Sequence, residues 1–504
     1  MFVTDKVPTK NLTPTKPDTT AFIKSLIAAN VVIKKDSASS KKEKAPVIKR
    51  KRLVNVHLSD IRHKQDTTQV DTDNYRFDKQ VLVRVNLHDS TDTNNGEYDT
   101  AFIATKQRNY EVQYSINGVT SQIDFSFLNA NYQQFSGGGS PIYLNPGMNF
   151  LLKVGVSDLM EDYRLTGGIR FSFDFSDMEY LISYENLKNR LDRQLILHRQ
   201  ALDYYTTQFD GKQYTNEALY ILKWPFSTVS CVKGTAFLRN DRQVILSTYD
   251  IANLQAPDVN TYWGGLKGEY IFDNTRYIGL NLYYGTRYKF WAEYYQSMIT
   301  QEKDLFVLGF DFRNYQKIHK SFIWANRFAA STSFGHDKLI YYLGGVDNWL
   351  FPKFNNDITI ATDQHYAYQT LATNMRGFTQ NIRNGNSFAV FNSELRFPVF
   401  RYLSKKPIKS DFINNFQIIG FGDVGTAWNG SSPWAPDNAL FTHIIPGNPI
   451  TITLTKDIQP IVEGFGFGLR SRLLGYFMRA DWAWGVDNGV IQPIVFYFSL
   501  SLDF

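Results

Sequence analysis

The sequence predicts an all-β protein, a transmembrane antiparallel β-barrel. Strand-like alternation of apolar and polar residues recurs along the chain, and aromatic residues make up 15% of its 504 residues. The sequence has no run of about 18 apolar residues, the length that a membrane-spanning helix requires. Because only every second residue of a barrel strand meets lipid, a barrel also agrees with the modest mean hydropathy of −0.32. Composition alone also fits a large soluble β-sandwich.

The clearest alternation is in the segment 494–504. One parity holds Ile494, Phe496, Phe498, Leu500, Leu502 and Phe504, and the other holds Val495, Tyr497, Ser499, Ser501 and Asp503. Alternate side chains of a strand point to opposite faces, so one face is wholly apolar. Such a face would make a soluble edge strand aggregate, but it suits a wall between lipid and a water-filled lumen. We interpret Phe498, Leu500, Leu502 and Phe504 as a C-terminal strand signal.

Earlier segments repeat this pattern and confine charge to one parity. The apolar sets are Ile169, Phe171, Phe173, Phe175; Ile278, Leu280, Leu282, Tyr284, Tyr288, Phe290; Phe306, Leu308, Phe310, Phe312; and Tyr476, Met478, Trp482, Trp484. The opposing polar sets are Arg170, Ser172, Asp174; Asn281, Arg287, Lys289; Asp311, Arg313; and Arg479, Asp481. The recurrence predicts a charged lumen.

Residues 1–104 are expected to be a polar, largely disordered linker or the remnant of an upstream periplasmic region, and 105–504 the barrel. Segment 34–52 holds nine Lys or Arg, and 66–95 is rich in Asp, Thr and Asn. Such stretches bury too little apolar surface to fold alone. The run 49–52 lacks interleaved aromatics, so we expect no nucleic-acid partner. Residues 1–20 form no signal peptide, which an exported barrel requires, so we expect a longer protein or a misplaced start.

One segment, between Gly345 and Asn386, shows no clean alternation. Loops of about forty residues are usually functional or disordered, and the many aromatics here argue against disorder. This loop contains Met375-Arg376-Gly377-Phe378. By itself, Arg-Gly-Phe would be an ordinary loop tripeptide.

The motifs around this loop resemble, over 340–504, the C-terminal barrel of the bacterial surface-antigen superfamily, the BamA-, TamA- and FhaC-like outer-membrane assembly and translocation proteins. They are Tyr341-Tyr342-Leu343-Gly344-Gly345, Glu394-Leu395-Arg396-Phe397-Pro398, Gly420-Phe421-Gly422-Asp423-Val424-Gly425 and Gly464-Phe465-Gly466-Phe467-Gly468-Leu469-Arg470. The resemblance implies 16 strands and a long loop, following the eleventh strand, that folds into the barrel. It also implies that the Arg376-Gly377-Phe378 tip touches Asp423. Met375 replaces the usual β-branched residue.

The polar parity of the flanking strands favours a lid lock, a loop held against the barrel wall by charge pairs. The expected wall partners are Asp423, Glu394, Arg470, Arg479 and Asp481. If Asp423 points inward, alternation along its strand points Phe416, Ile418 and Val424 toward lipid. In the strand at 464–473 the residues expected to face lipid are Phe465, Phe467, Leu469 and Leu473. The same alternation places Arg470, Arg472 and the glycines of 464–468 inward, where glycine leaves room for a loop.

No pattern indicates an enzyme, a catalytic residue, a metal site or a cofactor. The Gly464-x-Gly-x-Gly run lies in an alternating strand, Ser136–Ser140 reads as a turn, the eight histidines lack metal spacing, and Cys231 is the single cysteine.

The resemblance implies a protein of the bacterial outer membrane that assists insertion of outer-membrane proteins or translocation of polypeptide. Expected partners are outer-membrane lipid and either unfolded β-barrel clients or periplasmic accessory proteins. Family members normally carry periplasmic POTRA repeats ahead of the barrel, and residues 1–100 do not resemble one. An upstream domain that the sequence does not include, such as a TolB-like β-propeller, could stand in their place. The alternative is therefore a passive outer-membrane pore or surface receptor with the same fold. A soluble β-rich interaction protein is a third reading, which leaves the apolar outer faces unexplained.

Overall fold

A computed structural model of the chain describes residues 83–84, 101–102, 113–124, 132–135, 149–172, 178–205, 210–246, 251–300, 302–361, 363–404, 406–435, 438–445, 452–455, 457–473, 475–500 and 502–504. The chain divides into Met1–Gln107 and Arg108–Phe504. In the first unit, β1 (Val83–Arg84) pairs antiparallel with β2 (Ala101–Phe102). The expectations for the rest of 1–104, for 136–140 and for 173–175 lie outside the described residues.

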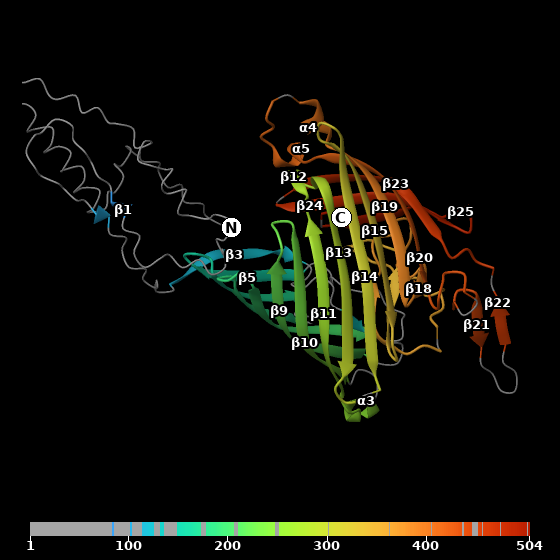
Figure 1. Cartoon of the computed structure of the whole chain (residues 1–504). Coiled ribbons are helices and arrows are strands. Elements are labelled where there is room, and N and C mark those ends of the chain that lie inside the picture. Colours follow the sequence, from blue (N-terminus) through green and yellow to red (C-terminus); the bar gives the residue numbers. More distant parts are fainter. Residues whose placement is uncertain are drawn as a thin grey trace, which may run out of the picture. The chain divides into compact units, whose positions relative to one another are not determined.

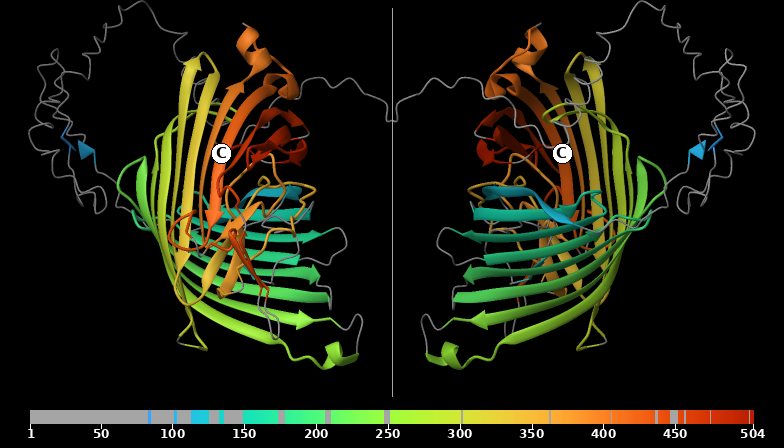
Figure 2. Two further views of the ribbon diagram at one scale, coloured as in Figure 1. Left: turned by 90° about the vertical axis from the view of Figure 1, so that its right-hand side faces the viewer. Right: turned by 90° about the vertical axis from the view of Figure 1, so that its left-hand side faces the viewer.

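The second unit is a barrel wall of antiparallel strands that follow one another in sequence order (Figure 1, Figure 2). The wall strands are β3 (Tyr114–Asp124), β5 (Asn149–Asp158), β6 (Tyr163–Ser172), β7 (Met178–Asn186), β8 (Asp192–Tyr205), β9 (Asp210–Pro225), β10 (Ser230–Ile245), β11 (Val259–Asp273), β12 (Arg276–Gly279), β13 (Leu282–Ser297), β14 (Asp304–His319), β15 (Phe322–Phe334), β19 (Ser387–Phe397), β20 (Gln417–Trp428), β23 (Val462–Leu473), β24 (Tyr476–Asp487), β25 (Val490–Ile491) and β26 (Val495–Ser499). The predicted all-β fold class is confirmed.

Sixteen long strands make up this wall in the part of the chain that the structure describes. The short strands β12 and β25 pair with β13 and β24 and thereby extend β11 and β26. The two ends of the series, β26 and β3, are neighbours in the barrel. No residue register joins these two strands among the described residues, whereas every other neighbouring pair of long strands has one.

Alternation along the wall strands sends large apolar side chains outward and charges inward, as predicted. Leu197, Phe290 and Phe467 are 46–50% exposed, while Arg170 and Asp481 are at most 2% exposed. The outer face therefore presents the apolar surface that lipid requires, since water would leave this much apolar area unfavourably exposed.

Three details of the predicted strands are wrong. Segment 278–290 is a hairpin, because Asn281 adopts the left-handed conformation (φ 63°) and the chain turns there; Leu282 is consequently buried. Arg472 is exposed and pairs with Asp411 at 3.6 Å, while Ser471 is buried. The last strand ends at Ser499.

Beyond Ser499 the chain leaves the outward alternation. Phe498 and Leu500 are half-buried and Leu502 is 43% exposed, but Phe504 is only 5% exposed. Phe504 packs inside against Leu282, Tyr315 and Ile323. Its predicted lipid-facing position is therefore wrong, because the strand pairing that enforces alternation has already ended.

The segment between β15 and β19 follows the eleventh long strand and contacts the inner side of the wall. It is not structureless: β16 (Lys338–Leu343), β17 (Tyr366–Leu371) and β18 (Arg383–Gly385) form a sheet in the order β18-β16-β17-β4, with β4 at Gln133–Gln134. We call residues 335–386 the infolded segment. Its Leu339, Tyr341 and Phe378 pack against wall residues such as Leu305 and Val390, so part of the lumen is an apolar core rather than water-filled.

The remaining elements lie in connections. They are α3 (Ile251–Gln255), α4 (Val399–Leu403) and α5 (Asp411–Asn414), and the hairpin β21 (Thr442–Ile445) with β22 (Ile452–Thr455). None of the helices in the described part of the chain has the length and apolarity to cross a membrane.

Candidate functional site: the lumenal lock

Arg376, at the tip of the infolded segment, is bound to two carboxylates of the wall. Its Nε and Nη2 donate to the two carboxylate oxygens of Asp423 on β20, each at 2.7 Å. Its Nη1 donates to Glu394 Oε1 on β19 at 2.6 Å. All three side chains are at most 1% exposed. A bidentate contact of this kind is among the strongest and most directional that a guanidinium forms.

Further groups complete the shell around this pair. The backbone N–H of Arg376 donates to Asp423 Oδ2 at 3.1 Å, and Asn392 Nδ2 donates to Asp423 Oδ1 at 2.8 Å. The guanidinium centre lies 3.7 Å from the centroid of the Phe421 ring. Asp423 therefore accepts four hydrogen bonds, which offsets the cost of burying its charge.

The strand register explains why these groups meet. Asn392 lies opposite Asp423, and Glu394 opposite Phe421, in the β19–β20 ladder. Residues two apart share a face, so Asn392 and Glu394 both point into the lumen. We call Arg376, Asp423 and Glu394 the lumenal lock.

Glycines of β23 and β24 let the tip approach the wall. A Cβ added at Gly464 would collide with the carbonyl oxygen of Arg376, and one at Gly485 with the ring of Phe378. Gly377 itself has φ +99°, and a Cβ there would lie 2.6 Å from the backbone nitrogen of Gly485. The backbone of the tip thus lies close to the backbone of the wall strands, at positions where only glycine fits.

The tip also binds the last wall strand. The Tyr497 hydroxyl accepts from Gly377 N–H at 2.9 Å and donates to the Phe378 carbonyl at 2.6 Å. Elsewhere in the infolded segment, Leu350 N–H donates to the Phe498 carbonyl at 3.0 Å. Phe378 is 4% exposed. The infolded segment therefore connects β20 with β26.

Three of the predicted wall partners, Arg470, Arg479 and Asp481, form a neighbouring cluster. Within the described part of the chain they have no hydrogen bond or ion pair with Arg376, although the charge of Asp481 acts on it. Arg470 Nη1 donates to Asp481 Oδ1 at 2.6 Å and its Nε to Asp503 Oδ2 at 2.9 Å. Arg479 Nε lies 3.0 Å from Asp503 Oδ1. Burial alone would raise the pKa of the Asp503 carboxyl, which lies beyond the end of β26, but the neighbouring arginines, Arg470 first, lower it below its ordinary value.

Arg396 links this cluster to the lock. Its Nε donates to Glu394 Oε2 at 2.9 Å, and its Nη2 donates to the Phe504 carbonyl at 3.0 Å. Asn281 adds a further contact, donating to Asp503 Oδ2 at 2.7 Å. One continuous polar network thus runs from the tip of the infolded segment to the last residues of the chain.

Sequence reasoning did not identify several members of this network. Asp503 and Tyr497 were on the polar parity of the final segment and Arg396 stood beside Glu394, so a signal was present for each. Asn281 lies 222 residues from Asp503 along the chain. Nothing local in the sequence indicates that pairing.

The opposite side of the infolded segment has a second anchor. The Tyr368 hydroxyl of β17 donates to Asp241 Oδ2 on β10 at 3.0 Å, and Arg239 Nε donates to the same oxygen at 2.8 Å. The Arg239 guanidinium also lies 4.4 Å from the centroid of the Tyr368 ring. The infolded segment is therefore anchored to two separate parts of the barrel wall, at β10 and at β19–β20.

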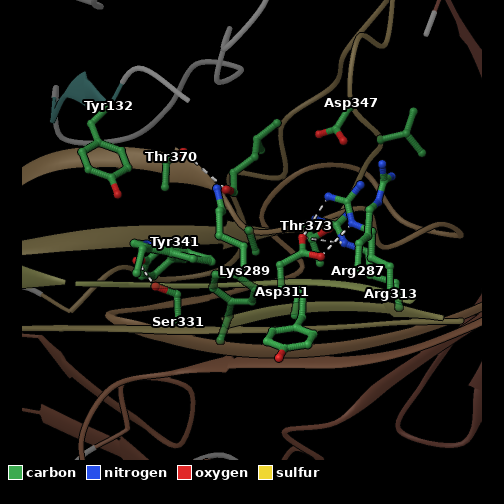
Figure 3. A pocket seen from close by; sticks show the side chains of 18 of the residues that line it. Tyr132, Arg287, Lys289, Asp311, Arg313, Ser331, Tyr341, Asp347, Thr370 and Thr373 are labelled. Atoms are coloured by element: carbon green, nitrogen blue, oxygen red, sulfur yellow. Dashed lines mark hydrogen bonds and ion pairs between the residues drawn. The ribbon is translucent and has the colours of Figure 1, made fainter. Parts of the chain in front are cut away.

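A cavity of about 630 Å³ remains between the infolded segment and strands β11 to β15 (Figure 3). Charged side chains such as Lys289, Asp311 and Arg313 line it together with Tyr341 and Thr370. Among the described residues, no group of three or more His, Cys, Asp or Glu side chains is arranged to hold a metal ion.

Comparison with known proteins gives similarity in structure only. No protein-family model matches the chain, and no curated protein matches it. The chain is similar to BamA from Haemophilus ducreyi lacking POTRA domains 1–3 (11% identity, TM-score 0.46, covering 77% of this chain and 75% of that chain). It is also similar to CdiB from Acinetobacter baumannii (12%, 0.42, 78% and 65%) and CdiB from Escherichia coli (10%, 0.39, 78% and 67%). The strand order of the chain itself shows the predicted antiparallel β-barrel.

Proposed function

We propose that this barrel assists the insertion of outer-membrane proteins or the translocation of polypeptide across the bacterial outer membrane. The observation that carries the proposal is the double attachment of the infolded segment. The segment binds β20 through Arg376 and β26 through Tyr497. Breaking the lumenal lock would therefore also change the contacts of the last wall strand, β26.

The position of β26 gives this attachment a function. No register joins β26 to β3 among the described residues, so this seam lacks the pairing that joins the other long strands. Backbone groups at an open strand edge are costly in lipid unless another strand pairs with them. An incoming client strand would supply that pairing by β-augmentation. In this proposal the protein performs no covalent chemistry, and its partners are lipid and unfolded client chains.

Depletion of the protein in its host tests the assembly role. We expect the amounts of other outer-membrane barrels to fall and to recover on complementation with the unmodified chain. Arg376→Ala, expressed to the same level, should complement poorly. The matched control Arg164→Ala, which removes an exposed pair with Glu161, should complement fully. Unchanged barrel amounts on depletion would contradict the proposal.

The alternative is a passive pore or surface receptor with the same fold. The lumenal cavity of about 630 Å³ favours it, because a pore or receptor requires space for a solute inside the barrel. Planar-bilayer recording separates the two proposals. Steady conductance by the unmodified protein, together with unchanged barrel amounts on depletion, would support the pore.

A further inference from the structure

Three arginines stand side by side on the lumenal face of the wall. Arg287 of β13 lies directly opposite Arg313 of β14, and Arg313 lies directly opposite Arg327 of β15. Like charges in directly opposed positions of neighbouring strands destabilise a sheet. We call these three residues the arginine row. Such an arrangement requires compensating negative charge.

The wall supplies one carboxylate for two of the three arginines. Asp311 accepts from Arg313 Nε at 2.7 Å and from Arg327 Nη2 at 2.6 Å. Arg287 has no ion pair with any residue that the structure describes. Its guanidinium lies beside the rings of Tyr283 and Tyr315, at 5.7 and 5.5 Å from their centroids. Its Nε is buried and lacks a hydrogen-bond partner within the described ranges.

Other acidic groups nearby do not fully neutralise the positive charge of the arginine row. Asp273 of β11 lies directly opposite Arg287. Its carboxylate accepts hydrogen bonds from the backbone N–H of Thr275 at 2.9 Å and from the Thr275 hydroxyl at 2.6 Å. Asp347 faces the row from the infolded segment, and its charge acts on Arg313 and Arg327, but it forms no ion pair with a described residue. Lys289 adds a further positive charge, 3.6 Å from Glu269. The row therefore retains unpaired guanidinium donors.

The side chains that carry these donors line an open space, although the Arg287 Nε atom itself is covered. The arginine row and Lys289 line the cavity of about 630 Å³, and Thr373 lines it from the infolded segment. The Thr373 hydroxyl is buried and has no hydrogen-bond partner among the described residues. Figure 3 shows Arg287, Arg313 and Asp311 gathered between the wall strands and the segment that carries Thr373 and Asp347. Side chains that carry unsatisfied donors thus lie on both sides of one volume.

We propose that this cavity binds the phosphate group of a small soluble phosphate ester. A carboxylate offers two oxygens in one plane, whereas the tetrahedral phosphate group of an ester offers three terminal oxygens to several guanidinium groups at once. Arg287 supplies the free donors, Arg313 and Arg327 supply charge, and Thr373 adds a neutral donor. The rest of the cavity, which Trp349 and Tyr341 line, has room for the organic part of the ester. This inference is independent of the assembly role.

Calorimetric titration of the full chain in detergent tests the proposal, with glycerol 3-phosphate and inorganic phosphate as probes at constant ionic strength. We expect saturable binding at one site for both probes and none for acetate. Arg287→Gln should weaken glycerol 3-phosphate binding roughly tenfold or more, because it removes a charged hydrogen-bond donor. The matched control Arg276→Gln, at an exposed position of β12 outside the cavity, should bind as the unmodified chain does.

A second variant keeps the test decisive if Arg287→Gln does not fold. Thr373→Val preserves side-chain shape and removes only the hydroxyl, so it should weaken binding without disturbing the wall. Binding of glycerol 3-phosphate that is unsaturable, or that is equally strong in the folded Arg287→Gln or Thr373→Val variants, would overturn the proposal. Equal binding of acetate and phosphate would overturn the assignment to phosphate.

Discussion

Arg376 and Asp423, 47 residues apart in the chain, share two hydrogen bonds of 2.7 Å in the buried interior of the barrel. Removing one partner leaves the other charge buried, at a cost of roughly 3–5 kcal/mol. We expect Arg376→Ala and Asp423→Ala each to lower the free energy of unfolding by about this amount. The double variant should lose less than the sum of the single losses. Equilibrium unfolding, followed by the fluorescence of the nine tryptophans, measures the three values.

The control for this cycle is Arg164→Ala. Arg164 and Glu161 also form an ion pair, at 2.6 Å, but both side chains are well exposed. Its loss should change the free energy of unfolding by less than about 1 kcal/mol. Strictly additive losses at Arg376 and Asp423 would exclude the lock as an energetic unit.

The close approach of the tip to the wall predicts that two glycines cannot be enlarged. Gly464→Ala would place a methyl group against the Arg376 carbonyl, and Gly485→Ala would place one against the Phe378 ring. We expect each to cost about 1–3 kcal/mol through overpacking and to expose the infolded segment to protease. Limited proteolysis of the folded protein measures that exposure. Gly422→Ala is the matched control, because a Cβ there meets nothing within 4 Å. Equal cleavage of all three variants would contradict the close approach.

The alternation of the wall could be predicted because it depends on local patterns. Alternation puts Asp423 and Glu394 on the polar parity of their strands, whereas the contact of the Arg376-Gly377-Phe378 tip with Asp423 was expected only from the family resemblance. The inward turn of Phe504 could not be predicted, because it depends on contacts that are distant in sequence. Asp503 binds Asn281, and Asn281 is positioned by a hairpin turn that interrupts an otherwise continuous alternation.

The tip of the infolded segment is hydrogen-bonded to the last strand through the Tyr497 hydroxyl. Tyr497→Phe removes both hydrogen bonds to the tip and leaves the Gly377 N–H buried without its partner, whereas the Phe378 carbonyl still accepts from the Gly345 N–H at 3.0 Å. The ring contact with Trp349, at 4.8 Å between centroids, is retained. We expect a loss of about 1–3 kcal/mol in the free energy of unfolding. Tyr262→Phe, at a position 43% exposed on the outer face, is the control and should be neutral. Equal stability of the two variants would show that the hydroxyl contributes nothing.

The end of the chain is held by the charge of Asp503. Asp503→Asn keeps the side-chain shape but removes the negative charge that lies 3.0 Å from Arg479 Nε and 2.9 Å from Arg470 Nε. We expect the free energy of unfolding to fall by roughly 3–5 kcal/mol, because a buried guanidinium loses its close partner. Asp411→Asn is the matched control, since that carboxylate is 73% exposed and makes only a 3.6 Å pair.

Charge can be separated from packing by adding Arg479→Leu to the Asp503→Asn variant. If the loss is caused by an unpaired buried charge, removing that charge should restore part of the stability. If Asp503 acts only through its shape, the first substitution should be neutral and the second should be destabilising, since leucine fills the space of the arginine less completely. Unfolding of the single and double variants under the same conditions decides between these outcomes.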